Sequence, residues 1–459
     1  MKSKFKIQIQ NSNHNFKYNI HQKLNNMKQI KLTALFTLLF LFAKCEGRQK
    51  EQSLHKNIPA FFSEIKEATQ KNKDLWGIDL YGPMLFIDPQ TRQLFANEPD
   101  MAGALKPDGS IYSGFLPNNV NFANTAIDWN GKRWAMIMLP LPKNKQERIT
   151  LLAHELFHKV QPSLGFTFYN VENNHLDQKD GRIYLRLELE ALKKATQSSS
   201  EAEIQQHLTN ALTFRKYRNK LFPGTNITEN TLELHEGLAE FTGLIISGRN
   251  KKQTKKYFVD GINSFFTNPT FVRSFAYYTV PAYGYLLYNK NRNWNKDITS
   301  TTNLTNFFIK EFNIDIPTDL KKTVELLSDN YNGKAIIREE TEREEKIRKT
   351  IAEYKRKFIE SPHFELRFEN MNVSFDPRNI MPIDNYGTVY PNIRITDLWG
   401  ILTVEKGALM SPNWDKITIT NPIRTENKKV IGDGWTLELT DGYFIQKDEK
   451  SGNYRLMKK

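Results

Sequence analysis

Cysteine is almost absent from this sequence of 459 residues, which contains one, Cys45. An intrachain disulfide and a zinc cluster of several cysteines are therefore excluded. Acidic residues are also in deficit, because 65 lysines and arginines stand against 51 acidic residues and give a net charge of +14. Such a surplus can indicate nucleic-acid binding, depending on where it lies. With 39% hydrophobic and 12% aromatic residues, the chain can bury real cores and is not wholly disordered.

The positive charge is concentrated at the start of the chain. Residues 1–45 contain eight lysines and no acidic residue. Subtracting them leaves 57 basic and 51 acidic residues, or +6, over residues 46–459. A net charge of +6 is small for a protein that binds nucleic acid, so we expect no nucleic-acid partner.

Residues 1–45 have the pattern of a signal peptide. A basic stretch that begins at Met27, the expected start, precedes an apolar run over residues 32–43. A run of about a dozen residues is too short to cross a bilayer but is typical of a signal-peptide core. We therefore expect an exported protein that is either secreted or held by a lipid anchor at the cell surface or in the periplasm.

Cys45 directly follows the apolar run and has two interpretations. As a lipobox cysteine it would carry a lipid and tether the protein to a membrane. However, Lys44 stands where a lipobox usually has a small residue, and ordinary signal cleavage nearby is the alternative.

The pattern after residue 45 predicts an α+β protein. We expect a helix over residues 56–74 and then a β-rich segment to residue 140. In that segment, strands over 126–129 and 133–139 flank Asn130-Gly131, a hairpin signal. The second strand ends at Pro140, which favours an edge strand. Further strands are expected over 84–88, 94–96 and 111–115, and helices over 145–160, 182–197, 201–220, 229–247, 254–266, 270–289, 303–312 and 318–329.

The last third of the chain changes pattern twice. Residues 335–360 interleave acidic and basic side chains at helical spacing, which predicts a solvated linker helix. From residue 361 to 459, alternating apolar and polar residues predict an all-β accessory domain of about seven strands. Its tryptophans could form a carbohydrate platform, although we favour a place in the core of a sandwich. These tryptophans are Trp399, Trp414 and Trp435.

The segment that carries chemistry is His154-Glu155-Leu156-Phe157-His158. Histidines four apart on a helix share one face, at a separation that suits one zinc ion. Glu155, beside them, can accept a proton from a metal-activated water. Composition alone gives this pattern an expectation of roughly 0.01 in the chain, which disfavours coincidence.

Zinc needs a third protein ligand, and the sequence offers two options. We favour Glu236, with Glu240 four residues on accepting the N–H of a ligand histidine. The alternative is Glu188 or Glu190, although ion pairs with Arg182, Arg186 or Lys194 would also explain those glutamates. We interpret two further histidines, His175 and His207, as surface or core residues.

The combination of H-E-L-F-H at 154–158 and E-G-L-A-E-F at 236–241 resembles the gluzincin branch of zinc metallopeptidases. The surroundings resemble uncharacterised exported bacterial members, and the likeness covers roughly residues 75–290. It implies a zincin-like metallopeptidase domain over 46–334, zinc as cofactor, ligands His154, His158 and Glu236, and Glu155 as catalytic base. One departure is the 77 residues (236 − 158 − 1) between His158 and Glu236, more than is usual in this branch.

These observations predict an exported zinc metallopeptidase that cleaves peptide or protein substrates. A donor for the reaction's oxyanion is expected, with Tyr283 and His235 favoured over Tyr277 and Tyr278. The strand over 134–139 could pair with an extended substrate, unless a loop covers it. The alternative is a non-catalytic surface-anchored protein whose β domain binds glycan or protein. The oligomeric state is not predicted.

Overall fold

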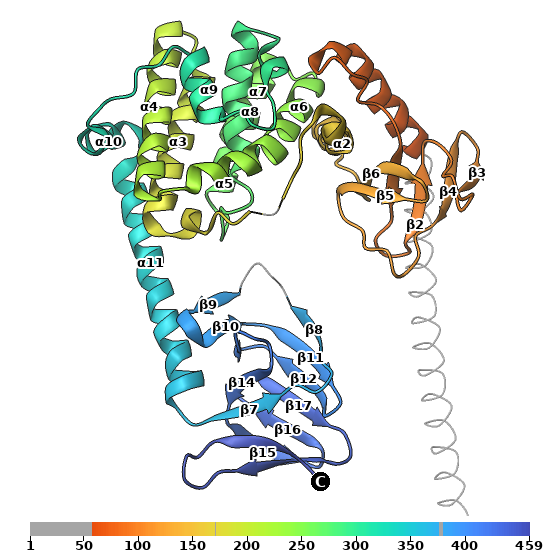
Figure 1. Ribbon diagram of the computed structural model, residues 1–459, viewed down its shortest axis with the longest axis vertical. Helices are drawn as coiled ribbons and strands as arrows, with labels where there is room; N and C mark the ends of the chain where they lie inside the picture. The colour runs from red at the N-terminus through yellow and green to blue at the C-terminus, as the bar shows by residue number, and fades with distance from the viewer. Residues whose placement is uncertain (1–56, 170, 376–379) are drawn as a thin grey trace, which may run out of the picture. The chain divides into compact units, whose positions relative to one another are not determined.

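The computed structural model describes residues 57–169, 171–375 and 380–459 (Figure 1). The chain divides into two compact units, Met1–Val160 and Gln161–Lys459. The expected signal peptide, its start at Met27 and the lipidation candidate Cys45 lie outside the described residues. Within the described part, no helix combines the length and apolarity needed to span a membrane.

The first unit contains a six-stranded sheet of order β3-β4-β2-β1-β6-β5. β1 and β6 pair in parallel, and the other neighbours are antiparallel. Leu85 and Ile87 face one core, whereas Phe86 points to the other face and stacks on Phe62. Both faces of the central strands are covered, which explains their continuous apolar runs. The strands are β1 (Met84–Ile87), β2 (Gln93–Ala96), β3 (Lys106–Asp108), β4 (Ile111–Phe115), β5 (Thr125–Trp129) and β6 (Lys132–Met138).

The predicted hairpin is confirmed, but the predicted edge strand is wrong. Asn130 and Gly131 have φ of 46° and 83°, and the positive values at both positions suit the tight turn between β5 and β6. β6 lies between β1 and β5, so β5 is the edge strand. Just before the start of β5, Asn124 Oδ1 accepts a hydrogen bond from the N–H of Met138 at 2.8 Å. An extended substrate therefore finds no open side along β6, because neighbouring strands and Asn124 already occupy it.

Two helices accompany this sheet, over residues 57–71 and over α2 (Lys145–Val160). The prediction for α2 is confirmed, and the first helix gives way after residue 71 to a short turn, η1 (Lys73–Leu75). Arg148 of α2 forms an ion pair with Glu64 of the first helix, with Nε 2.7 Å from Oε2. Trp76 packs on Phe157 at 4.7 Å between ring centroids. These contacts hold α2 in a fixed place within the first unit.

The second unit begins with a helical part, in which α3 packs along α4. Each helix predicted there is present, with ends shifted by a few residues. The helix predicted over 229–247 is interrupted by a π-helical turn, η4 (Glu233–Gly237). The helices are α3 (Lys179–Gln197), α4 (Glu201–Leu221), α5 (Thr225–Leu232), α6 (Leu238–Ile246), α7 (Lys251–Phe265), α8 (Ala276–Lys290), α9 (Leu304–Glu311) and α10 (Leu320–Ser328). Short turns are η2 (Gln161–Leu164), η3 (Asn174–Asp177), η5 (Trp294–Asp297) and η6 (Asp329–Tyr331).

The predicted linker helix is present as α11 (Gly333–Lys355) and a π-helical turn, η7 (Arg356–Glu360). It is not solvated on every side, because Glu340 is buried against α3. The Glu340 carboxylate lies 2.7 Å from both Arg182 Nε and Arg186 Nη1. Alternating acidic and basic residues are expected both on a helix face in water and on one that contacts oppositely charged side chains. The sequence pattern therefore did not predict this contact.

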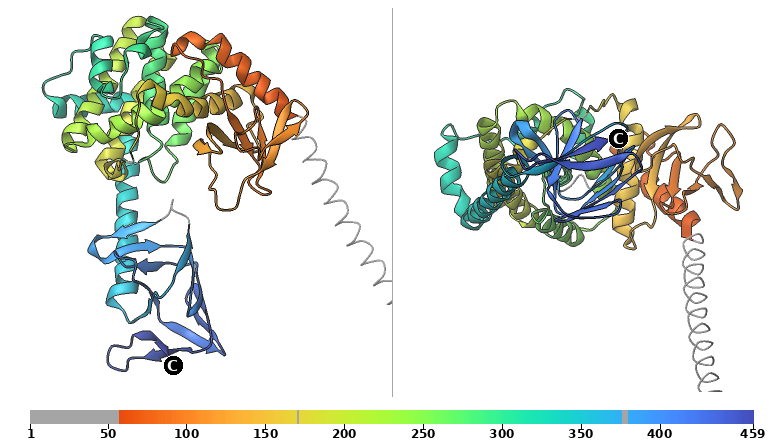
Figure 2. Two further views of the ribbon diagram at one scale, coloured as in Figure 1. Left: turned by 45° about the vertical axis from the view of Figure 1, so that its right-hand side comes forward. Right: turned by 90° about the horizontal axis from the view of Figure 1, so that it is seen from below.

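The C-terminal region is all-β, as predicted, but its described residues form a seven-stranded and a six-stranded sheet rather than about seven strands. Both sheets contribute to one core, which makes a sandwich (Figures 1 and 2). Short turns divide the alternating sequence more often than we expected; for example, Pro391 and Asn392 separate β10 from β11. The strands are β7 (His363–Arg367), β8 (Asn372–Phe375), β9 (Met381–Ile383), β10 (Gly387–Tyr390), β11 (Ile393–Asp397), β12 (Gly400–Val404), β13 (Ala408–Met410), β14 (Lys416–Thr420), β15 (Pro422–Glu426), β16 (Lys429–Gly432), β17 (Trp435–Leu439), β18 (Tyr443–Lys447) and β19 (Tyr454–Lys458), and the turn η8 (Asp384–Tyr386) precedes β10.

The three tryptophans of this region have different environments. Trp399 and Trp435 belong to the core, as we favoured from the sequence. Trp414 is 38% exposed and meets the ring of Tyr390 edge-on. The three tryptophans therefore form no common platform, and the favoured core position is wrong for Trp414.

Candidate metal centre

α2 places His154 and His158 on one face, as their spacing predicts. Both side chains are buried. Their Nε2 atoms lie 2.9 Å apart, and their rings meet edge-on at 4.6 Å between centroids. Two imidazoles that direct the same nitrogen at one point offer a divalent metal two of its ligands.

Glu155 stands next to His154 on α2 and is 4% exposed. A solvated surface carboxylate would instead lie open to water, as most glutamates do. The first unit thus holds both histidines and the candidate base on one buried stretch of helix.

Glu236 lies in the π-helical turn η4 of the second unit. Both of its carboxylate oxygens are held within that unit. The Tyr277 hydroxyl donates to Oε2 at 2.5 Å, and His235 Nδ1 lies 3.0 Å from Oε1. The neighbouring Gly237 permits close packing, since a Cβ there would fall 2.6 Å from the Val280 side chain. The turn therefore presents one carboxylate in a defined orientation.

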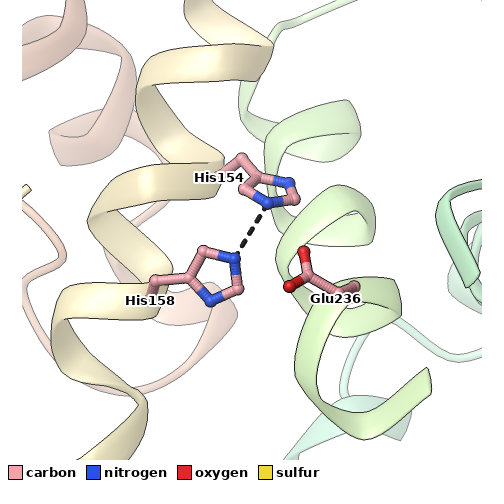
Figure 3. Close-up of side chains that lie close together, drawn as sticks. All are labelled: His154, His158 and Glu236. Atoms are coloured by element: carbon pink, nitrogen blue, oxygen red, sulfur yellow. Dashed lines mark hydrogen bonds between the residues drawn. The ribbon is translucent and has the colours of Figure 1, made fainter. Parts of the chain in front are cut away.

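The ligand atoms of His154, His158 and Glu236 all lie within 4.8 Å of one another (Figure 3). Two ligands bound to one zinc at about 2.1 Å are at most about 4.2 Å apart, which is of the same order. Two imidazoles and one carboxylate form a donor set that zinc accepts, and other first-row divalent metals accept it too. The residues fit a metal ion.

The alternative ligands Glu188 and Glu190 are committed to other partners. Glu188 is fully buried, and its oxygens lie 2.7 Å from Arg215 Nε and from Arg218 Nη1. Glu190 pairs with Lys193 at 2.7 Å. The predicted ion-pair partners are therefore wrong, because α4 packs along α3 and supplies the arginines for Glu188.

The prediction for Tyr283 as oxyanion donor needs correction. Its hydroxyl is fully buried and already donates to Glu188 Oε1 at 3.0 Å. Burial and the charge of Glu188 both raise the pKa of Tyr283, which keeps this donor protonated. Tyr277 and Tyr283 are six residues apart, so their directions from a helix differ by about 120°, and Tyr277 is the tyrosine that reaches Glu236.

His235 and Glu240 both lie beside Glu236 in the sequence and have contacts of their own. The His235 ring stacks on Phe168, with centroids 4.0 Å apart. Phe168 is 43% exposed, and nothing in its loop sequence pointed to this contact. Glu240 accepts a hydrogen bond from the Tyr257 hydroxyl at 2.5 Å. The roles of His235 as oxyanion donor and of Glu240 as partner of a ligand histidine stay predictions.

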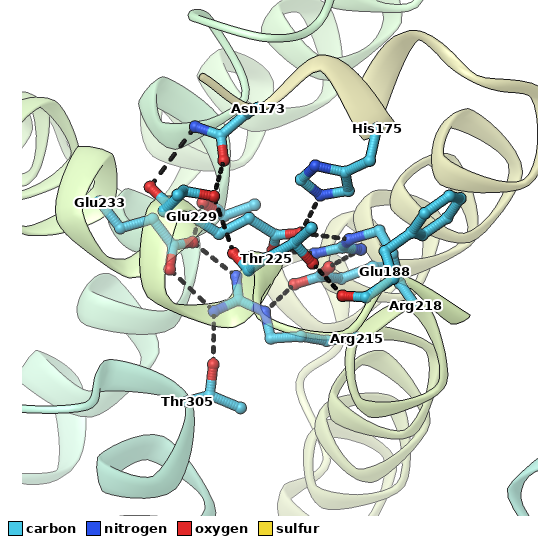
Figure 4. A network of polar contacts seen from close by, with 12 residues as sticks. Asn173, His175, Glu188, Arg215, Arg218, Thr225, Glu229, Glu233 and Thr305 are labelled. Atoms are coloured by element: carbon cyan, nitrogen blue, oxygen red, sulfur yellow. Dashed lines mark hydrogen bonds and ion pairs between the residues drawn. The ribbon is translucent and has the colours of Figure 1, made fainter. Parts of the chain in front are cut away.

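The second unit also contains a buried charge network that we did not predict from the sequence (Figure 4). Arg215 Nη2 lies 2.7 Å from Glu233, and Arg218 Nη2 lies 2.7 Å from Glu229. Both arginines also bind Glu188. The only sequence signal was two arginines three apart on α4 and two glutamates four apart, one on α5 and one at the start of η4. Such spacing usually marks a solvated face.

His175 and His207 make structural contacts, in line with our interpretation of them as surface or core residues. His175 is buried and joins the network, with Nε2 2.7 Å from Glu229 Oε1. His207 Nδ1 lies 2.7 Å from the Tyr331 hydroxyl.

The two helix glutamates of the network have opposite pKa shifts. Burial by itself would raise the pKa of Glu229, but the charge of Arg218 and the hydrogen bond from His175 outweigh burial and lower it. For Glu233 burial dominates, and its pKa is raised despite Arg215. Pairing therefore outweighs burial at Glu229, whereas at Glu233 it does not.

Compared with known proteins, the chain matches no protein-family model, no curated protein and no solved structure.

Proposed function

We propose that the protein is an exported zinc metallopeptidase that hydrolyses peptide bonds. His154, His158 and Glu236 would hold the ion, and Glu155 would act as the base. The observation that carries this proposal is the gathering of three ligand atoms within 4.8 Å of one another, with a buried glutamate adjacent in the chain.

A bound zinc ion would lower the pKa of a water molecule and polarise the substrate carbonyl. Glu155 would take a proton from the attacking water as its oxygen bonds to the carbonyl carbon. It would return that proton to the amide nitrogen as the C–N bond breaks. Tyr277 and His235 hold the Glu236 carboxylate in place through the hydrogen bonds described above. Burial of Glu155 strengthens its interaction with nearby charge, because little water screens it.

The test combines metal analysis with peptide cleavage. We expect roughly one zinc per chain in the purified protein and cleavage of a peptide library that a chelator abolishes. Glu155→Gln keeps the shape of the side chain but removes the base, so cleavage falls about 10²- to 10⁴-fold while zinc stays bound. Glu190→Gln, a glutamate paired with Lys193, is the matched control and retains activity. Zinc-free wild type, or equal cleavage by Glu155→Gln, would contradict the proposal.

The alternative of a non-catalytic glycan binder has less support. It drew on three tryptophans, of which Trp399 and Trp435 are in the sandwich core. Burial leaves their rings no face for a sugar. Trp414 alone does not make a stacking platform, so the metallopeptidase is the better-supported function.

A further inference from the structure

We infer that the buried charge network positions the Glu236 carboxylate for metal binding, with Glu233 and Thr279 as positioning residues. This inference rests on the proposed role of Glu236 as a ligand. It concerns contacts inside the second unit alone. Glu229, Glu233 and Glu236 follow one another on a single helical stretch formed by α5 and η4.

The network fixes the rotation of that stretch against α4. Arg215 grips Glu233 with two nitrogens, Nη1 at 3.0 Å and Nη2 at 2.7 Å. One turn earlier, Arg218 binds both oxygens of Glu229 at 3.0 and 2.7 Å. Planar forks of this kind define direction as well as distance. The two glutamates cannot turn about the helix axis without breaking four hydrogen bonds.

The π-helical turn then separates Glu236 from the arginines. In an uninterrupted α-helix, Glu236 would stand seven residues after Glu229 and within about 20° of its direction. It would then face the same side as the arginine-bound glutamates. A π-helical turn contains an extra residue and rotates everything that follows. η4 begins at Glu233, so the last residue held by an arginine is the first residue of the turn.

α8 links the network to the ligand directly. The Thr279 hydroxyl donates to Glu233 Oε1 at 2.6 Å, and two residues earlier the Tyr277 hydroxyl donates to Glu236. Val280 packs so closely on Gly237 that a Cβ there would not fit. A shift of Glu233 would therefore move α8 and, with it, the hydroxyl that orients Glu236.

Stability alone does not account for such a network. Desolvating buried charges costs about as much as their attraction returns, and apolar replacements of buried ion pairs are often neutral or stabilising. What a fully paired network adds is a single arrangement of the helices that carry it. A metal ligand benefits from that, because partners behind the ligands typically contribute about 10- to 100-fold to metal affinity.

The experiment compares two network variants with two matched controls. Thr279→Val removes only the hydroxyl that reaches Glu233, and Glu233→Gln removes the charge. Thr213→Val is the control for the first, because Thr213 is equally buried and bonds its own helix at Thr209 O. Glu340→Gln is the control for the second, because Glu340 is equally buried in the ion pairs between α3 and α11.

Two readouts are measured on each full-length protein: the Zn²⁺ dissociation constant, from competition with a chromophoric chelator, and the absorption spectrum of bound Co²⁺. We expect Thr279→Val and Glu233→Gln to weaken Zn²⁺ binding about tenfold and to shift the Co²⁺ bands toward those of Glu236→Gln. Both controls keep wild-type affinity and spectrum, whatever their melting temperature. Should Glu233→Gln not fold, Thr279→Val decides.

Wild-type affinity and spectrum in the network variants would overturn the inference, as would equal losses in the controls. These outcomes leave the proposed function standing, provided that wild type binds zinc and Glu236→Gln binds it poorly. If wild type binds no zinc, or if Glu236→Gln binds it normally, the proposed metal site itself fails and the positioning role fails with it.

Discussion

Four glutamates along α5, η4 and α6 have the same chemistry and different surroundings. Glu229 and Glu233 are gripped by guanidinium groups. The contacts of Glu236 and Glu240 within the second unit include tyrosine hydroxyls, from Tyr277 and Tyr257. An arginine neutralises a carboxylate, whereas a phenol orients it and leaves its charge for another cation. Guanidinium groups thus hold the two structural glutamates, whereas tyrosine hydroxyls contact the proposed ligand Glu236 and Glu240, four residues after it.

The largest expected effect is a loss of stability when an arginine-bound glutamate is replaced. Glu229→Gln leaves Arg218 buried with one charge less to balance it, and we expect a loss of about 3–5 kcal/mol in the free energy of unfolding at pH 7. Denaturant titration at neutral pH measures it. A loss below 1 kcal/mol would show that Glu229 is replaceable, and the contrast with Glu236 would disappear.

The same variant gives a pH test. The folded-state pKa of Glu229 is lowered below its ordinary 4.5, so its stabilising contribution is present above that pH and is lost as the pH falls toward the folded pKa. The wild type therefore loses stability on acidification from pH 4.5 downward. Glu229→Gln lacks this component, and its unfolding free energy changes less over the same range.

The second effect is on metal binding. We expect Glu236→Gln to weaken Zn²⁺ binding by about 100-fold or more, since a ligand matters at least as much as the groups behind it. Its metal-free stability changes by less than about 1 kcal/mol, because the Glu236 side chain is only partly buried, at 19% exposed. Calorimetric Zn²⁺ titration and denaturant unfolding of the same preparation show both. A large stability loss with unchanged metal affinity would make Glu236 a structural residue and not a ligand.

A smaller effect is expected for the tyrosines. Tyr277→Phe removes the hydroxyl on Glu236 and weakens Zn²⁺ binding about tenfold. Tyr257→Phe removes the hydroxyl on Glu240 and has a smaller effect, because Glu240 is not proposed as a ligand. The Zn²⁺ dissociation constants of the two variants show which carboxylate matters more for metal binding. The opposite ranking would make Glu240 the ligand.

The smallest effect is expected for Glu190. Its ion pair with Lys193 lies at the edge of the buried region, so Glu190→Gln changes the unfolding free energy by less than about 1 kcal/mol. Zn²⁺ affinity stays at the wild-type value. A drop in affinity would restore Glu190 as a candidate third ligand.

The sequence predicted features that depend on local spacing. The i, i+4 histidines of α2 and the Asn130-Gly131 turn depend on a few neighbouring residues, and both are where they were expected. The bounds of α2 agree to the residue because Pro142 and the polar stretch after it mark its start clearly. The C-terminal β region was predicted as a class, since alternation reports half-buried strands.

What the sequence did not reveal depends on packing between distant segments. Glu188 forms ion pairs with arginines of α4, and Arg182 forms one with Glu340 of α11. No local spacing reports these pairs. The edge strand was misassigned because Pro140 ends β6 without saying which strands flank it. The π-helical turn could not be predicted either, since one additional residue in a helix leaves no distinctive composition.

The ion pair between Arg148 and Glu64 has a practical consequence for any shortened form of this protein. The helix over residues 57–71 buries Ile58, Phe62 and Ile65, and it covers one face of the sheet through the stack on Phe86. A recombinant fragment that starts after this helix would uncover that apolar face. It would also release the N-terminal half of α2, the helix whose C-terminal half carries both histidines. A shortened form should therefore begin no later than residue 57.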